Sequence, residues 1–142
     1  MRVPQRVLDA IAAHARRESP RECCGLLIGD DARIHEAVPT ANAAGDPVRR
    51  YAISPVDYFA QIRRCRALAE QRGAPLEVVG AYHSHPRSAP RPSPTDLQDA
   101  FEGFLFVIAG PVDGSEPFTL QAYRLVQGSF QPVPLIPEAG AH

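Results

Sequence analysis

Apolar residues recur along the chain with two different periods, one typical of helices and the other of strands. Between residues 4 and 18 the apolar positions are three or four residues apart, at Val7, Leu8, Ile11, Ala12 and Ala15. This spacing places them on one face of a helix. The pattern therefore predicts an amphipathic helix over 4–18, which Ser19-Pro20 ends.

Two further helices are predicted from the residues at their starts. Ser54-Pro55-Val56-Asp57 combines a preferred N-cap residue, a proline at the first helical position and an acidic residue near the positive end of the helix dipole. This helix should continue to Gly73. Ser93-Pro94-Thr95-Asp96 repeats the pattern and predicts a third helix that extends to about Glu102.

Short runs that are apolar throughout, or that alternate between apolar and polar residues, predict strands. They cover residues 23–29, 32–38, 51–53, 76–82, 104–110 and 118–126, with 129–136 as a last edge piece. The order of the elements predicts one α/β domain, with a central mixed β-sheet of about five or six strands and flanking helices. We expect this domain to occupy residues 1–134 and a flexible C-terminal tail to follow over 135–142.

Composition argues against several classes of function. The 142 residues are 44% hydrophobic and carry a formal net charge of −1, which fits a globular domain and provides no basic surface for nucleic acid. The apolar runs are far shorter than a membrane span, and charges interrupt the N-terminal region where a signal peptide would have its apolar core. Cys23, Cys24 and Cys65 form no CxxC pair, so we expect reduced thiols and a cytoplasmic protein.

The chemistry of the chain is concentrated where the 76–82 strand ends. His83 and His85 are two residues apart, so on a strand their side chains point to the same face, with backbones about 6–7 Å apart. Asp96 follows a proline-rich loop that can fold back over the strand end. Two imidazoles and one carboxylate would leave one position of a catalytic zinc ion open for water.

The same residues also allow a purely structural interpretation. An exposed strand end can carry two histidines, and Ser93-Pro94-Thr95-Asp96 is a good helix cap by itself. The chain contains its own control, because Ser54 begins the same cap pattern with no histidine nearby in sequence. The cap pattern alone therefore identifies no site, and the residues by themselves leave both interpretations open.

The complete pattern resembles the signature of the JAMM (MPN-type) zinc metalloproteases. That signature is an upstream glutamate, then His-Ser-His-Pro, then a spaced Ser-x-x-Asp, which His83-Ser84-His85-Pro86 and Ser93 to Asp96 match. Residues 20–29, PRECCGLLIG, also resemble the segment in which the family's catalytic glutamate lies. The resemblance extends from about residue 5 to the strand near 126 and is closest to the small prokaryotic members.

The resemblance implies a fold and a role for each matching residue. The fold would be the MPN/JAB domain, whose architecture is related to that of cytidine deaminases. His83, His85 and Asp96 would bind Zn²⁺, Glu22 would act as general base, and Ser93 would stabilise the oxyanion. The implied reaction is hydrolysis of a peptide or isopeptide bond at the C-terminal Gly-Gly tail of a ubiquitin-like or sulfur-carrier protein, with no nucleic-acid or membrane partner.

Two alternatives belong to other classes of function. A metal-free MPN-type scaffold would only bind partners, but such scaffolds have lost metal ligands that are present here. A nucleobase deaminase would require H-x-E and a downstream PCxxC, which this chain lacks. Cys23 and Cys24 are interpreted as small apolar residues beside the site. Ser84 is expected to point to the face opposite the histidines, and we assign it no catalytic role.

Overall fold

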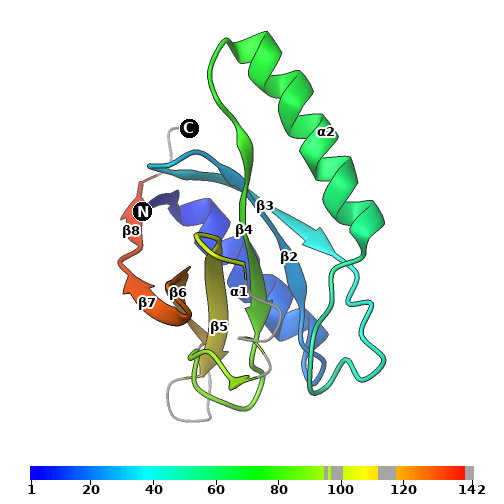
Figure 1. Ribbon diagram of the computed structural model, residues 1–142. Helices are drawn as coiled ribbons and strands as arrows, with labels where there is room; N and C mark the ends of the chain where they lie inside the picture. The colour runs from blue at the N-terminus through cyan, green and yellow to red at the C-terminus, as the bar shows by residue number, and fades with distance from the viewer. Residues whose placement is uncertain (95, 97–100, 112–117, 140–142) are drawn as a thin grey trace.

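The computed structural model describes residues 1–94, 96, 101–111 and 118–139. The elements follow the order β1 (Arg2–Pro4), α1 (Gln5–Glu18), β2 (Cys24–Gly29), β3 (Ile34–Thr40), α2 (Pro55–Arg72), β4 (Glu77–Ser84), β5 (Leu105–Pro111), β6 (Phe118–Val126), β7 (Ser129–Val133) and β8 (Ile136–Glu138). Strands β3-β2-β4-β5-β6-β7 form one six-stranded sheet (Figure 1). Only the β4–β5 pair is parallel within the described part of this sheet, so the predicted mixed α/β domain is confirmed.

Two expectations about individual segments need correction, and a third concerns residues that lie partly outside the described part of the chain. Residues 51–53 are not a strand, because the loop uses the backbone of Ala52: its N–H donates to Asn42 and its carbonyl accepts from Ala43 N–H. The tail expected from residue 135 is not flexible throughout, because β8 pairs in parallel with β1. Pro94 and Asp96 are helical as predicted for the third helix, whose residues 95 and 97–100 lie outside the described part of the chain.

Helix α1 covers one face of the sheet (Figure 1). Its apolar stripe of Val7, Ile11 and Ala15 is buried, as the spacing predicted. These residues pack in one core cluster with Leu27 of β2 and Val107 of β5. The cluster fixes β2, β4 and β5 side by side, and these are the strands around the two histidines.

Helix α2 lies on the other face and is much less buried. Its predicted ends are confirmed: Ser54 Oγ accepts from Val56 N–H at 3.2 Å, and Gly73 closes the helix with a left-handed φ of 65°. Within this fully described helix only Cys65 is buried, while Phe59 is 59% exposed. In Figure 1 much of α2 projects beyond the sheet. No helix formed by the described residues is long and apolar enough to cross a membrane.

Strands β2 and β4 leave no room for a side chain at Gly25. This residue pairs with Tyr82, and a Cβ atom at position 25 would overlap the Tyr82 ring and the Val38 carbonyl oxygen. The space left by the missing side chain is filled by Tyr82, which is 1% exposed. Its hydroxyl lies 2.8 Å from His14 Nδ1 on α1, so helix and strand are joined inside the core.

The contact at Gly25 predicts the effect of a single methyl group. Gly25→Ala should lower the free energy of unfolding by at least about 1–3 kcal/mol, because the ring and the backbone oxygen must both move. Gly45→Ala is the matched control, since a Cβ there meets no atom within 4 Å. Urea denaturation of both variants measures the difference, and equal stabilities would show that the β2–β4 approach tolerates a side chain.

Buried His14 predicts a pH dependence of stability. Burial, aided by the positive charge of Arg17, lowers the pKa of His14 below its ordinary 6.5. The unfolded chain then binds the proton more readily, so this contribution to stability is present above pH 6.5 and is lost as the pH falls below it. Urea denaturation at pH 7.5 and 5.5 measures this effect. Between these two pH values the free energy of unfolding should fall more for the wild type than for His14→Gln. An equal loss in both proteins would contradict this assignment.

Candidate metal centre

The two histidines converge at the carboxyl end of β4. His83 is 1% and His85 8% exposed, and their Nε2 atoms lie 3.1 Å apart. The backbone N–H of His85 donates to the Ala109 carbonyl at 2.8 Å, so β5 holds the histidine just beyond the strand end. The expectation that both rings point to the same side of the strand is therefore met.

Asp96 joins the histidines through both of its carboxylate oxygens. Oδ1 lies 3.2 Å from His83 Nε2, and Oδ2 lies 3.3 Å from His85 Nε2. The same carboxylate accepts from Ser93 N–H at 2.7 Å, while Ser93 Oγ accepts from Asp96 N–H at 3.2 Å. The capping interpretation and the metal interpretation therefore describe the same two residues, and the cap holds the carboxylate toward the histidines.

The spacing of the three side chains fits a tetrahedral ion. Ligands bound to zinc at about 2.0–2.1 Å are separated from one another by about 3.3 Å. The separations of 3.1, 3.2 and 3.3 Å agree with this value. His85 Nδ1 lies 3.1 Å from the Ala89 carbonyl oxygen, which requires a proton on Nδ1 and leaves the lone pair of Nε2 for a metal.

His83 is held in a different way. Its Nδ1 is buried and has no hydrogen-bond partner among the described residues. The Tyr51 ring instead stacks on the imidazole, with ring centroids 4.2 Å apart and planes inclined by 16°. Burial lowers the pKa of His83 and so favours the neutral ring that binds metals.

Glu22 lies beside the histidines, just before β2. Its carboxylate and the ring nitrogens of His83 and His85 all lie within 4.8 Å of one another. Burial raises the pKa of Glu22 to about 7, with the charge of Asp96 acting in the same direction and His85 opposing it. A carboxyl group with a pKa near neutrality can accept a proton and return it at neutral pH.

Asp96 has the opposite protonation preference. Burial opposes ionisation, but the adjacent imidazoles of His83 and His85 outweigh it and hold the pKa of Asp96 far below its usual range. Asp96 therefore stays ionised, as a metal ligand must, while Glu22 can exchange protons. The two carboxyl groups have the protonation behaviour that their different proposed roles require.

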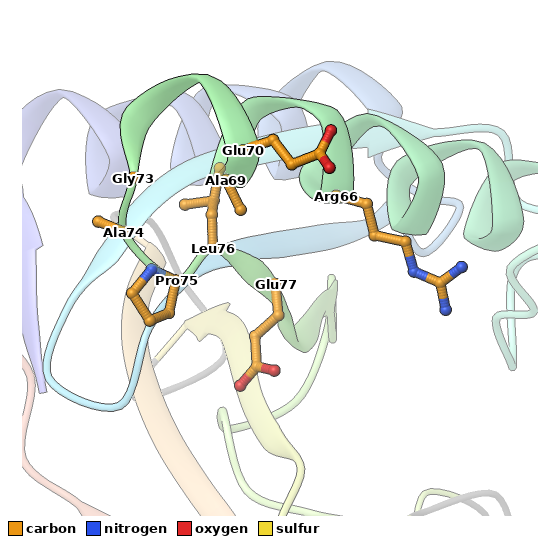
Figure 2. Close-up of a pocket in the computed structure, with 8 residues that line it drawn as sticks. All are labelled: Arg66, Ala69, Glu70, Gly73, Ala74, Pro75, Leu76 and Glu77. Atoms are coloured by element: carbon orange, nitrogen blue, oxygen red, sulfur yellow. The ribbon is translucent and has the colours of Figure 1, made fainter.

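A large apolar cavity lies between the sheet and the N-terminal part of α2. Its volume is ≈ 630 Å³, and aromatic residues dominate its lining, including Tyr51, Tyr58, Phe59, Phe104 and Phe106. Tyr51 lines this cavity and also stacks on His83, so this one ring contacts both the cavity and the candidate metal centre. A second, open hollow lies where α2 turns into β4, and Figure 2 shows that it lies near Glu77, the first residue of β4. This places the second hollow at the opposite end of the strand from His83.

The structure brings together every residue that the sequence proposed for the site. Glu22, His83, His85, Ser93 and Asp96 form one connected group. Sequence reasoning missed Tyr51 and assigned no role to Asn42, whose side-chain amide donates to the Glu22 carbonyl at 2.9 Å. Both lie in the loop after β3, where no periodic pattern indicates which residue contacts the site.

Comparison with known proteins agrees with this geometry. Residues 4–126 match the model of the family described as prokaryotic homologs of the JAB domain. The chain is 36% identical over 110 residues to a desampylase of Haloferax volcanii, an alignment that covers 72% of this chain and 75% of the relative. It is 34% identical to a probable TtuB-protein conjugate cleaving protease of Thermus thermophilus, covering 83% and 74% of the two chains.

A third relative and two solved structures extend the comparison. The chain is 29% identical to a CysO-cysteine peptidase of Mycobacterium tuberculosis, covering 91% of this chain and 85% of the relative. It shares its fold with protein DSY2949 of Desulfitobacterium hafniense, at a TM-score of 0.80, 22% identity and coverage of 98% and 93%. A structure described as a JAMM metalloprotease-like zinc site in the proteasome and signalosome matches at a TM-score of 0.58 and 21% identity, covering 97% of both chains. This chain belongs to the prokaryotic JAB-domain family, the small prokaryotic branch of the JAMM/MPN proteins.

Proposed function

We propose that the protein is a zinc metallopeptidase that cleaves at the C-terminal Gly-Gly tail of a ubiquitin-like sulfur-carrier protein. The observation that carries the proposal is the zinc-like spacing of His83, His85 and Asp96, with the buried Glu22 carboxylate beside them. A metal-free scaffold would have no need for three converging donors and a carboxyl group whose pKa is raised to about 7.

Each residue then has a distinct task in hydrolysis. His83, His85 and Asp96 would hold the zinc ion, which when bound polarises a carbonyl group and acidifies water. Glu22 would take the proton from the attacking water and return it to the leaving amine. Ser93 Oγ accepts from Asp96 N–H and would donate its own proton to the oxyanion.

The substrate class is supported by the names of the relatives. One is named for cleaving TtuB conjugates and another as a peptidase for a CysO–cysteine bond. The first name describes cleavage of a protein conjugate and the second a peptidase, so both kinds of substrate should be tested on this chain. All three cysteines are free and buried, which supports our proposal that the protein works in the reducing cytoplasm.

Zinc binding should depend on the three proposed ligands and not on Glu22. His83→Ala and Asp96→Ala should lose most zinc affinity, while Glu22→Gln should retain it. At free zinc about 100-fold above Kd the wild type should gain about 2.7 kcal/mol of stability, a gain absent from His83→Ala. Competition titration and thermal unfolding measure both effects. His35→Ala, which removes a histidine paired with Asp30 at 3.0 Å, is the control and should bind zinc normally.

Turnover should depend strongly on the general base and on the oxyanion donor. Glu22→Gln should lower kcat by about 10²–10⁴-fold, and Ser93→Ala by about 10²-fold, with zinc content unchanged. The assay uses sulfur-carrier proteins extended beyond Gly-Gly by a short peptide, or joined there to a lysine side chain, and follows cleavage by mass spectrometry. Full activity of Glu22→Gln would remove this residue from the mechanism.

A further inference from the structure

The peptide group that joins Glu22 to Cys23 is held on both sides by side chains. The Cys23 N–H donates to Ser84 Oγ at 2.8 Å. The Glu22 carbonyl oxygen of the same peptide group accepts from Asn42 Nδ2 at 2.9 Å. Because the two bonds act on opposite ends of one planar unit, together they restrict its rotation.

Ser84 extends the pairing of β2 and β4 beyond the last register pair. Cys24 pairs with His83, and one step further Ser84 N–H donates to the Cys23 carbonyl at 3.1 Å. The return bond from Cys23 N–H ends on the Ser84 hydroxyl. Ser84 is 0% exposed, so removing its hydroxyl would leave a buried backbone N–H without this acceptor.

Asn42 connects the same peptide group to the loop that contacts the metal centre. Its Oδ1 accepts from the backbone N–H of Ala52 at 3.1 Å, and its Nδ2 donates to the Arg50 carbonyl at 3.0 Å. Arg50 and Ala52 are the neighbours of Tyr51, which stacks on His83. One amide side chain thus orients both Glu22 and the residue that packs against a proposed metal ligand.

We propose that Asn42 and Ser84 are positioning residues, which aim the Glu22 carboxylate at the metal centre by fixing the peptide group that follows it. The inference rests on the proposed function, in which Glu22 is the general base. A base must lie within hydrogen-bonding reach of the proton it removes, and a shift of about 1 Å can cost about 10²-fold in rate. Neither residue needs to touch the substrate for this effect.

Three variants and a matched control test the proposal. Ser84→Ala removes the acceptor for Cys23 N–H, and Ser84→Thr keeps a hydroxyl. Asn42→Asp retains the Oδ1 acceptor for Ala52 but replaces the donor to Glu22 with an oxygen. Thr40→Val is the control, because Thr40 Oγ1 donates to the Cys24 carbonyl at 3.3 Å, two peptide groups further along.

The first measurement does not require catalysis. Amide hydrogen exchange, followed by NMR, should be about tenfold or more faster at Cys23 in Ser84→Ala than in the wild type, and unchanged in Thr40→Val. Unchanged exchange at Cys23 in Ser84→Ala would overturn the proposal. This measurement decides the matter even if the wild type cleaves no carrier protein, an outcome that would refute only the proposed function.

The second measurement separates positioning from general stability. In zinc-loaded protein, Ser84→Ala and Asn42→Asp should each lower kcat by about 10–100-fold with KM and zinc content unchanged, while Ser84→Thr and Thr40→Val stay within about twofold of the wild type. Combined with Glu22→Gln, neither change should slow the residual reaction further, because no base is left to aim. An equal loss of kcat with and without Glu22→Gln would mean a structural role and would overturn the proposal. If Ser84→Ala does not fold, the same comparison with Asn42→Asp decides.

Discussion

The pairing of β2 with β4 is the interaction on which the site depends. It is antiparallel and sets Cys24 opposite His83, so Glu22, two residues before β2, is brought close to the strand that carries His83. Glu22 and His83 are 61 positions apart in the sequence, and this register brings them together. A shift of the strands by one residue would turn the ligand side chains to the opposite face of the sheet.

A second constraint is the free-energy cost of burying charged side chains away from water. Asp96 is ionised there because two histidines and a backbone N–H surround its oxygens. Glu22, with fewer such partners, shifts toward the protonated form instead. The centre therefore separates two chemically similar groups by their surroundings, which is the usual physical origin of distinct acid and base roles.

Much of this could be predicted from the sequence, and the failures have a physical pattern. The helices over 5–18 and 55–72 followed from periodicity and caps, and the convergence of His83, His85 and Asp96 followed from a strand end and a matching motif. The strand predicted over residues 51–53 was wrong because the side chain of Asn42 forms hydrogen bonds with the loop backbone that a neighbouring strand would otherwise form. The β1–β8 pair was not predicted because contacts between the two ends of a chain leave no local sequence pattern. Ser84 was correctly placed on the opposite face, but its bond to a backbone N–H could not be predicted from position alone.

The burial of the two cysteines that follow Glu22 has a consequence for the reactivity of their sulfurs. Burial raises the pKa of the Cys23 thiol to about 11 and also raises that of Cys24, whose sulfur lies 3.4 Å from Thr40 Oγ1. Only the deprotonated thiolate is a strong ligand, and it is the form that attracts soft ions such as Cu(I). With both sulfurs protonated, the two thiols bind soft ions weakly and react slowly. Apolar surroundings thus let the chain carry two cysteines directly after Glu22 without giving either sulfur the reactivity of a thiolate.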